Sequence, residues 1–389
     1  MLMRRKDIDW LRLFGILLLF PFHTARVFDA REANYIENLT KSSAGETFMN
    51  VIWPWFMPLL FLIAGISTYF ALRKRSGKEF ALERVLRLLV PCALGIILIV
   101  PIQGYVARLQ DGTLSGSYFN YLFYQFFPDF SDLSGYRGTF TPAHLWFILF
   151  LFIISIAVLP VCIATLRHRR DKGIGAFGRL FEKGWFLALL FIPLLISEAL
   201  PDISGKNPFF YALYYMIGFF IASNENAWKS IDKIKWKSLI LVAVTVPLFL
   251  FFKNISYGKD DFAWQCILYG LFRNMYGWSA LLFMLAFAQM FLNRGGKVLD
   301  YLSQAAFPVY ILHQSVMMVI AFFVVQWDMG VTGKFLIIMF ATLAASIALY
   351  EALRHIMPFR TVLGIKRAKI SKGKERGEKI KSEKIKMNS

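Results

Sequence analysis

An arginine and a histidine lie eleven positions apart in the first apolar stretch of the sequence. This stretch, DIDWLRLFGILLLFPFHTARVF, contains Arg12 and His23. Eleven residues turn an α-helix through about 1100°, or three turns and roughly 20°, so both side chains project from one face about 16 Å apart. Arginine is a permanent cation, and histidine can accept a proton at neutral pH. The spacing therefore predicts a cation and a catalytic base that face a common interior.

Asp9 precedes Arg12 by three positions and is expected to form an ion pair with it. Each basic residue also has a simpler explanation. Arg12 could extend toward the membrane surface, and His23 could be a hydrogen-bonded packing residue. A charged side chain at the centre of a bilayer costs roughly 2.5–3.5 kcal/mol on insertion scales, and such residues mark functional sites. Their shared face favours the functional interpretation.

A second basic pair occurs in LERVLRLLVP, residues 82–91, where Arg84 and Arg87 are three positions apart. This spacing predicts that both lie on one face of a helix that leaves the cytoplasm. Arginine binds phosphate through two parallel hydrogen bonds and keeps its charge. Together with Arg12, the pair predicts a binding site for a phosphate-rich donor. The alternative is that these arginines only set the orientation of the helix in the membrane.

The elements that must position these residues are membrane-spanning helices. The chain has 389 residues, of which 57% are hydrophobic and 18% charged, and its mean hydropathy is +0.51. Apolar runs long enough to cross a bilayer recur along the sequence. We predict an all-α polytopic membrane protein with about ten transmembrane helices, near residues 8–29, 49–72, 85–108, 144–166, 184–201, 207–223, 238–253, 262–292, 304–326 and 334–357.

Basic clusters occupy every second connection between these runs, for example RKRSGK at 73–78 and RHRRDK at 167–172. This alternation places both termini in the cytoplasm and predicts a multi-pass protein of the cell (inner, cytoplasmic) membrane. The domain division is a transmembrane domain at 1–357 followed by a tail at 358–389. The tail holds 11 Lys/Arg against 3 Glu and predicts a disordered cytoplasmic segment near anionic lipids.

Nucleic acid is not an expected partner, because no aromatic residue interleaves with the charges of the tail. The three cysteines Cys92, Cys162 and Cys266 have no metal-ligand spacing, and no metal site is predicted. The oligomeric state is left open by these patterns.

Four short elements, in the same order along the chain, resemble the acyltransferase-3 family of integral membrane O-acyltransferases. They are the Arg12–His23 spacing, the Arg84–Arg87 pair, FLIAGIS at 61–67 and YILHQS at 310–315. The stretches DWLR, RLLVP with VPIQGY, and HLWFILFLF are similar to the branch of periplasmic glucan succinyltransferases. The resemblance extends over nearly all of residues 5–357. The sequence departs from the family at Ala64, where serine is common.

The resemblance implies transfer of an acyl group from cytoplasmic acyl-CoA, acetyl-CoA or succinyl-CoA, to a hydroxyl of an extracytoplasmic carbohydrate. No permanently bound cofactor is implied. The partners would be acyl-CoA, the carbohydrate acceptor and membrane lipids. Arg12, Arg84 and Arg87 would hold the phosphates, while His23 would take the proton of the hydroxyl or carry the acyl group.

Five further residues are candidates for supporting roles. Tyr310 and His313 are three positions apart and either line the acceptor side, orient the thioester or pack in the core. His144 and Trp146 open a helix on the outer side and are candidates for the acceptor side. Arg273 is a cation inside a predicted span and has no obvious partner in the sequence.

Two other classes of protein fit the apolar pattern. A polytopic transporter or flippase for a polysaccharide or its precursor would also contain buried charges, but the paired broken helices of internal repeats are not apparent. A scaffold for polysaccharide assembly without chemistry would leave the Arg12–His23 spacing unexplained.

Overall fold

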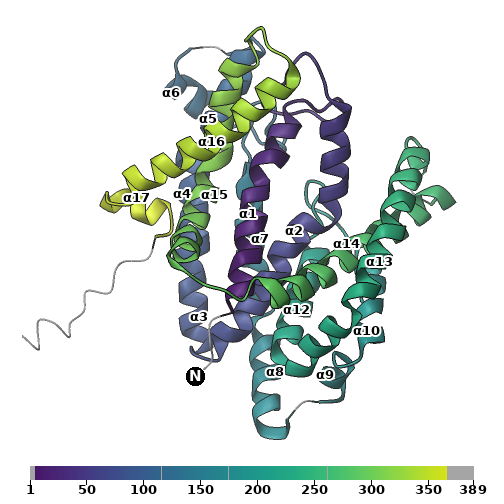
Figure 1. Ribbon diagram of the computed structural model, residues 1–389. Helices are drawn as coiled ribbons and strands as arrows, with labels where there is room; N and C mark the ends of the chain where they lie inside the picture. Colours follow the sequence, from purple (N-terminus) through teal and green to yellow (C-terminus); the bar gives the residue numbers. More distant parts are fainter. Residues whose placement is uncertain (1–4, 115, 174, 261, 366–389) are drawn as a thin grey trace, which may run out of the picture.

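The protein is an all-α polytopic membrane protein, and the computed structural model describes residues 5–365 except 115, 174 and 261 (Figure 1). Within these residues every regular element is a helix, apart from an isolated bridge between Ile203 and Lys206. The side chains of residues 170 and 172 are not described.

The helices of the N-terminal half are α1 (Lys6–Arg26), α2 (Ser43–Leu72), α3 (Gly77–Arg84), the π-helix η1 (Val85–Leu89), α4 (Val90–Leu98), α5 (Pro101–Gln110), α6 (Tyr118–Tyr121), the π-helix η2 (Leu122–Phe126), the 3-10 helix η3 (Ala143–Leu145), α7 (Trp146–Ala157), α8 (Leu159–Lys172) and α9 (Ala176–Leu180). Those that follow are α10 (Gly184–Leu189), α11 (Phe191–Ser197), α12 (Pro208–Ser223), α13 (Glu225–Ser256), α14 (Trp264–Phe291), α15 (Lys297–Val324), α16 (Val331–Leu353) and α17 (Met357–Val362).

Six helical segments in the described part of the chain are long and apolar enough to cross a membrane, and the count is seven if a bent pair forms one span. The bent pair consists of 143–157 and 159–169, which meet at 47°. Two shorter apolar helices cover Gly184–Ser197 and Pro208–Ser223. All ten predicted segments are helical, but a count of ten spans stays a prediction.

The third segment is a broken helix, and its breaks were not predicted. The span Gly77–Gln110 consists of α3, η1, α4 and α5. Pro91 is the second residue of α4, which follows η1, and Pro101 is the first residue of α5. A π-helix bonds residue i to i+5 and so places more residues in each turn than an α-helix. The side chains on the two sides of η1 are therefore rotated from their α-helical positions.

Helices α2 and α12 approach each other backbone to backbone. A Cβ atom on Gly65 would lie 1.8 Å from the carbonyl oxygen of Tyr215, and one on Gly218 would lie 2.1 Å from that of Leu62. Only glycine leaves room for this contact, which is a common way to pack helices in membranes. The close approach brings the cytoplasm-facing half of α2, as the basic clusters predict it, directly beside α12.

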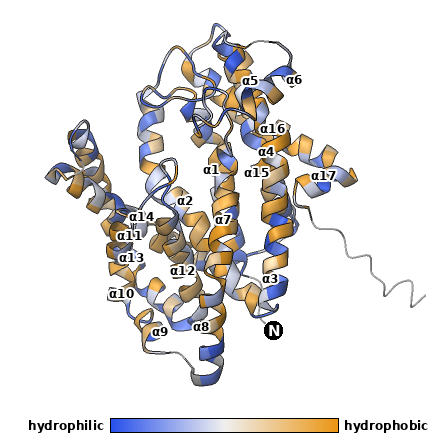
Figure 2. Ribbon diagram, turned by 180° about the vertical axis from the view of Figure 1, so that it is seen from behind, coloured by the Kyte–Doolittle hydropathy of each residue, from blue (hydrophilic) through white to orange (hydrophobic). Residues whose placement is uncertain are grey.

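Helix α1 runs through the centre of the bundle and contacts α2, α14, α15 and α16 (Figure 1). The N-terminus, α3 and α8 lie at one end of the molecule, and α6 lies at the other (Figure 1). Figure 2 shows hydrophilic residues where α3 and α8 end and hydrophobic residues along the helices between the two ends. The basic connections at 73–78 and 167–172 thus share one end, as their charge pattern predicts.

The first residues of the predicted tail are ordered, which differs from the expected disorder from 358 onward. Met357–Val362 form α17, which packs against α4, and Leu363 is 1% exposed. Burial of the apolar residues at 362 and 363 stabilises this helix. The composition of the tail is dominated by charge, so it did not predict this contribution. Residues 366–389, which hold most of its basic charge, lie outside the described residues.

Candidate active site

Two arginines from different helices meet on neighbouring residues of α2. The Arg12 Nη2 atom of α1 donates to Ser67 Oγ at 2.8 Å, and the Arg84 Nη2 atom of α3 donates to Thr68 Oγ1 at 3.0 Å. Arg12 also forms the predicted ion pair with Asp9, at 3.1 Å. We call Arg12, Arg84, Ser67 and Thr68 the arginine cluster. It places two permanent cations on consecutive residues of α2, near the end of the bundle where α1 begins.

The Thr68 hydroxyl links this cluster to α12. Thr68 donates to the carbonyl oxygen of Ala64 at 2.9 Å, and its oxygen lies 2.5 Å from the hydroxyl of Tyr215. A hydroxyl has a single proton to donate, so Tyr215 is the donor to Thr68. Thr68 therefore accepts from both Tyr215 and Arg84, an arrangement that depends on the glycine contact between α2 and α12.

Arg87 lies in a different environment from Arg84. Its Nη1 atom is 3.4 Å from Glu83 Oε1, and Glu83 also pairs with Arg75. The π-helix begins at Val85, between the two arginines, so the α-helical offset that predicted a shared face does not hold here. The structure places Arg12 and Arg84 on consecutive residues of α2 and Arg87 in a half-exposed ion-pair network.

Three histidines from three distant parts of the sequence converge near the other end of α1. The ring centroids of His23 and His313 are 5.3 Å apart, and those of His144 and His313 are 5.1 Å apart. His23 lies in the last turn of α1, His144 in η3 and His313 in the middle of α15. His313 is 0% and His144 6% exposed, whereas His23 is partly exposed. We call these three residues the histidine cluster.

The hydrogen bonds of His144 fix its tautomer. Its Nε2 atom lies 2.9 Å from the carbonyl oxygen of Ile311, which can only accept, so Nε2 carries the proton. Its Nδ1 atom therefore accepts from the amide of Gln103 at 3.2 Å. The same amide nitrogen donates to Ser315 Oγ at 2.9 Å, and Ser315 donates to Ile99 O at 2.9 Å. His144 is thus a neutral residue with both ring nitrogens engaged.

Tyr310 and His313 are connected through their backbone and side chains. The Tyr310 hydroxyl donates to the backbone carbonyl of His144. His313 Nδ1 lies 2.5 Å from the carbonyl oxygen of Tyr310. The Nε2 atom of His313 is buried and has no hydrogen-bond partner among the described residues. The two residues predicted as supporting candidates therefore lie beside His23 and His144.

No group of three or more metal-binding side chains that could hold an ion was found in the described part of the chain. The ring nitrogens of His144 are occupied by a carbonyl and an amide, which leaves it without a lone pair for a metal.

Trp146 and Arg273 belong to a neighbouring polar group. The ring of Trp146 packs 5.4 Å from that of Tyr211, and the Lys206 ammonium lies 5.5 Å from the Trp146 centroid. Burial lowers the pKa of Lys206. Arg273 is not without a partner, because its Nη2 atom lies 2.5 Å from Glu198 Oε2. The expectation failed because Glu198 is 75 positions away, although it is an acid within an apolar run and could have been singled out.

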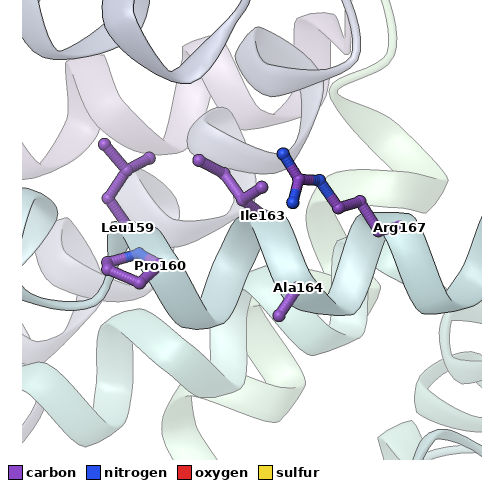
Figure 3. Close-up of a pocket in the computed structure, with 5 residues that line it drawn as sticks. All are labelled: Leu159, Pro160, Ile163, Ala164 and Arg167. Carbon is purple, nitrogen blue, oxygen red and sulfur yellow. The ribbon is translucent and has the colours of Figure 1, made fainter.

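Two hollows lie outside both clusters. One, of about 580 Å³, follows α8, where Leu159, Ile163 and Arg167 project from the same side of the helix (Figure 3). The other, of about 400 Å³, lies between α1 and α14 and is lined by Trp10, Leu11, Leu13, Phe14, Leu17, Phe283, Met284, Phe287 and Leu292. Both are mainly apolar and neither contains a histidine of the cluster, so they do not mark the site of chemistry.

Five polar residues of the two clusters and their supports were not identified from the sequence: Ser67, Thr68, Gln103, Tyr215 and Ser315. Single hydroxyls and amides are common in membrane helices, so their types gave no signal. Ser67 closes the FLIAGIS element, and Ser315 closes YILHQS. Their position at the ends of these two elements was the one feature of the sequence that could have singled out Ser67 and Ser315.

A helical membrane bundle with cations at one end of its central helix and buried histidines at the other is an arrangement suited to a multi-pass enzyme. The acyltransferase domain family, acyltransferase-3, matches residues 5–351, nearly the whole chain, so the protein belongs to this family. It is accordingly a membrane acyltransferase. No curated protein and no solved structure gives a significant match to the chain.

Proposed function

We propose that the protein transfers an acetyl or succinyl group from acyl-CoA at the cytoplasmic face of the cell membrane to a hydroxyl of an extracytoplasmic carbohydrate. The proposal rests on the observation that α1 contributes one residue to each cluster. Arg12 lies in its first half and contacts Ser67, whereas His23 lies in its last turn and contacts His313. One helix thus connects a group suited to phosphate with a group suited to proton transfer.

The donor end of the proposed site is the arginine cluster. Arg12 and Arg84 are each bonded through Nη2 to a hydroxyl on α2, and guanidinium groups also have further donors that suit phosphate oxygens. The acyl arm of the donor would run from there along α1 toward His23. Arg87 would contribute positive charge at the surface of this end. Its contribution would be smaller than that of Arg12 or Arg84, because Glu83 neutralises part of its charge.

The chemical step is a replacement at the acyl carbon. The acceptor oxygen forms a bond to this carbon, the carbon–sulfur bond breaks, and the electron pair leaves with the sulfur of CoA. His23 takes the hydroxyl proton and later gives it to the thiolate. In the alternative route, His23 first carries the acyl group itself. His23 makes no side-chain hydrogen bond among the described residues, which leaves its ring available for either role.

The acceptor end would be formed around Trp146, which follows His144 by two residues. An aromatic ring beside Tyr211 and the Lys206 ammonium provides a surface on which a sugar can stack. The ion pair of Arg273 and Glu198 would support this surface through its position near Tyr211, since both charges act on the Tyr211 hydroxyl.

The test is acyl transfer from labelled acetyl-CoA and succinyl-CoA to cell-envelope glycans in membranes that contain matched amounts of each variant. His23→Gln should retain donor binding and lower transfer by about 10²–10⁴-fold, because an amide cannot take a proton. Arg12→Ala should instead raise the acyl-CoA concentration required. Near-normal transfer by His23→Gln would contradict the role of this histidine. Glycan movement across the membrane without acyl transfer would favour the transporter class.

A further inference from the structure

His313 contains a buried nitrogen whose natural partner is the ring of His23. We propose that His313 is a positioning residue that accepts a hydrogen bond from one ring N–H of His23 and so directs the other nitrogen of His23 toward the substrate. The inference rests on the proposed function, in which His23 performs the chemistry. It assigns to His313 a specific task that neither acceptor binding nor packing would give it.

The proton count on His313 follows from its backbone contact. Its Nδ1 atom lies 2.5 Å from the carbonyl oxygen of Tyr310, and a carbonyl only accepts, so Nδ1 carries the proton. The Nε2 atom of neutral His313 is therefore a lone-pair acceptor. This atom is buried, the residue is 0% exposed, and no donor reaches Nε2 among the described residues. Buried polar atoms are nearly always paired, so this acceptor needs a donor in the working enzyme.

The side chains around His313 leave His23 as that donor. His144 packs edge-on at 5.1 Å, but its N–H is committed to Ile311 and its lone pair to Gln103. The Tyr310 hydroxyl donates to the carbonyl of His144. Phe20, at 5.8 Å, has no polar proton to give. His23 has both ring nitrogens without a side-chain hydrogen bond in the described part of the chain.

The separation of the two rings suits this bond. The His23 and His313 centroids are 5.3 Å apart at an angle of 46°. Two imidazoles joined by an N–H···N bond of about 2.9 Å have centroids roughly 5 Å apart, so a small rotation of His23 completes the contact. His313 is fully buried, whereas His23 is partly exposed. This difference in exposure places His23 at the substrate and His313 in support.

The proposed contact has a chemical consequence for each stage of transfer. In the resting enzyme, the N–H of His23 is held by His313, so its opposite nitrogen has the lone pair that attacks a proton or an acyl carbon. When His23 becomes positively charged, the lone pair of His313 remains bonded to it. His313 itself stays neutral and keeps its proton on Nδ1, bonded to Tyr310.

The test compares His313→Gln with His313→Met. Glutamine can keep an acceptor oxygen near the position of Nε2, whereas methionine fills a similar volume and does not accept comparably. We expect His313→Met to lower kcat for acyl transfer at least 100-fold with little change in the KM for acyl-CoA. His313→Gln should retain kcat within about 10-fold. Thr342→Val is the matched control, because it also removes a buried polar atom for which the described residues provide no partner, at a site on α16.

The two variants also separate positioning from direct proton transfer by His313. If His313 were itself the base, glutamine would be as inactive as methionine, because an amide cannot accept the proton. Equal inactivity of two variants that remain folded would therefore overturn the proposal. A Gln variant with high activity beside an inactive Met variant would support it.

A second measurement does not depend on acyl transfer at all. Diethyl pyrocarbonate acylates neutral imidazole nitrogens, and mass spectrometry reports the rate of this modification at His23 alone. We expect His313→Met to slow modification of His23 several-fold and His313→Gln to leave it near the wild-type rate. A rate that is unaffected by both changes would overturn the proposal. Absence of acyl transfer in the wild type, with the modification rates as expected, would instead contradict the proposed function.

Discussion

The two clusters on α1 are built in opposite ways. In the arginine cluster, the Arg12 side chain is 40% exposed and its guanidinium bonds to a serine hydroxyl and a carboxylate. In the histidine cluster, His144 and His313 are almost completely buried, and backbone carbonyls fix the position of a proton on each. One cluster consists of long, partly exposed cations, whereas the other consists of short, rigid rings.

This difference indicates a division of labour. Each arginine makes one hydrogen bond to a neutral hydroxyl of α2. A partly exposed arginine can exchange such a bond for a bond to a ligand oxygen at a small cost in free energy. Buried rings with fixed tautomers hold a geometry that does not reorganise during a reaction. Changes at the arginine cluster should therefore act on donor binding, and changes around the histidines should act on the rate of the bound complex.

After His23→Gln and His313→Met, the largest effect is expected from Arg84→Ala. Loss of a charge-assisted hydrogen bond costs about 1.5–3 kcal/mol, so the KM for acyl-CoA should rise roughly 10–100-fold while kcat changes little. Arg84→Lys should recover only part of the affinity, because an ammonium lacks the planar fork of donors. Titration of acyl-CoA in the transfer assay measures both values. A fall in kcat with unchanged KM would break the division of labour.

A smaller effect, on the other parameter, is expected from Gln103→Leu. This change removes the donor to His144 and to Ser315 and leaves acceptors buried without partners, at a cost of about 1–3 kcal/mol in stability. We expect kcat to fall about 10-fold and the KM for acyl-CoA to stay within about 2-fold, since the amide bonds to His144 of the histidine cluster. Melting temperature and steady-state kinetics are the measurements.

Gln304→Leu is the control for this change, because Gln304 is exposed on α15 and its amide, among the described residues, bonds to the carbonyl of Asp300 in its own helix. It should leave melting temperature and kcat at wild-type values. If Gln304→Leu and Gln103→Leu lowered kcat equally, the amide of Gln103 would have no particular role in the cluster.

A smaller effect on donor binding is expected from Thr68→Val, which removes the hydroxyl between Arg84 and Tyr215 without changing the shape of the side chain. A neutral hydrogen bond contributes about 1 kcal/mol, so the KM for acyl-CoA should rise roughly 3–10-fold. Tyr215→Phe removes only the donor to Thr68 and should have a still smaller effect. A larger change in KM for Tyr215→Phe than for Thr68→Val would show that α12, rather than Thr68, positions Arg84.

Features that depend on one helix were predictable from the sequence, and those that depend on how helices meet were not. The Asp9–Arg12 pair follows from helical periodicity and is confirmed. The π-helix that begins between Arg84 and Arg87 changes their angular offset, and helical periodicity contains no signal for it. The partner of Arg273 lies on another part of the chain, and charge patterns do not specify such long-range contacts.

The all-helical class was predictable because a membrane leaves few ways to satisfy backbone hydrogen bonds. The boundaries were less so. Helix α13 begins at Glu225, whereas the apolar run predicted a start near 238, because polar residues continue a helix beyond the hydrocarbon without any apolar signal. The convergence of three histidines was likewise hidden, since it arises from the packing of α1, η3 and α15.

The eleven residues from Arg12 to His23 fix two quantities along α1: the axial distance between the two side chains and the angle between their directions. Removing one residue between them would turn one side chain by about 100° relative to the other and take either Arg12 from Ser67 or His23 from His313. Removing four would nearly restore the angle but shorten the distance by about 6 Å. Under the proposed function, the acyl arm of the donor must span this distance along α1, so donors with shorter or longer arms should place their reactive carbon away from His23 and react more slowly.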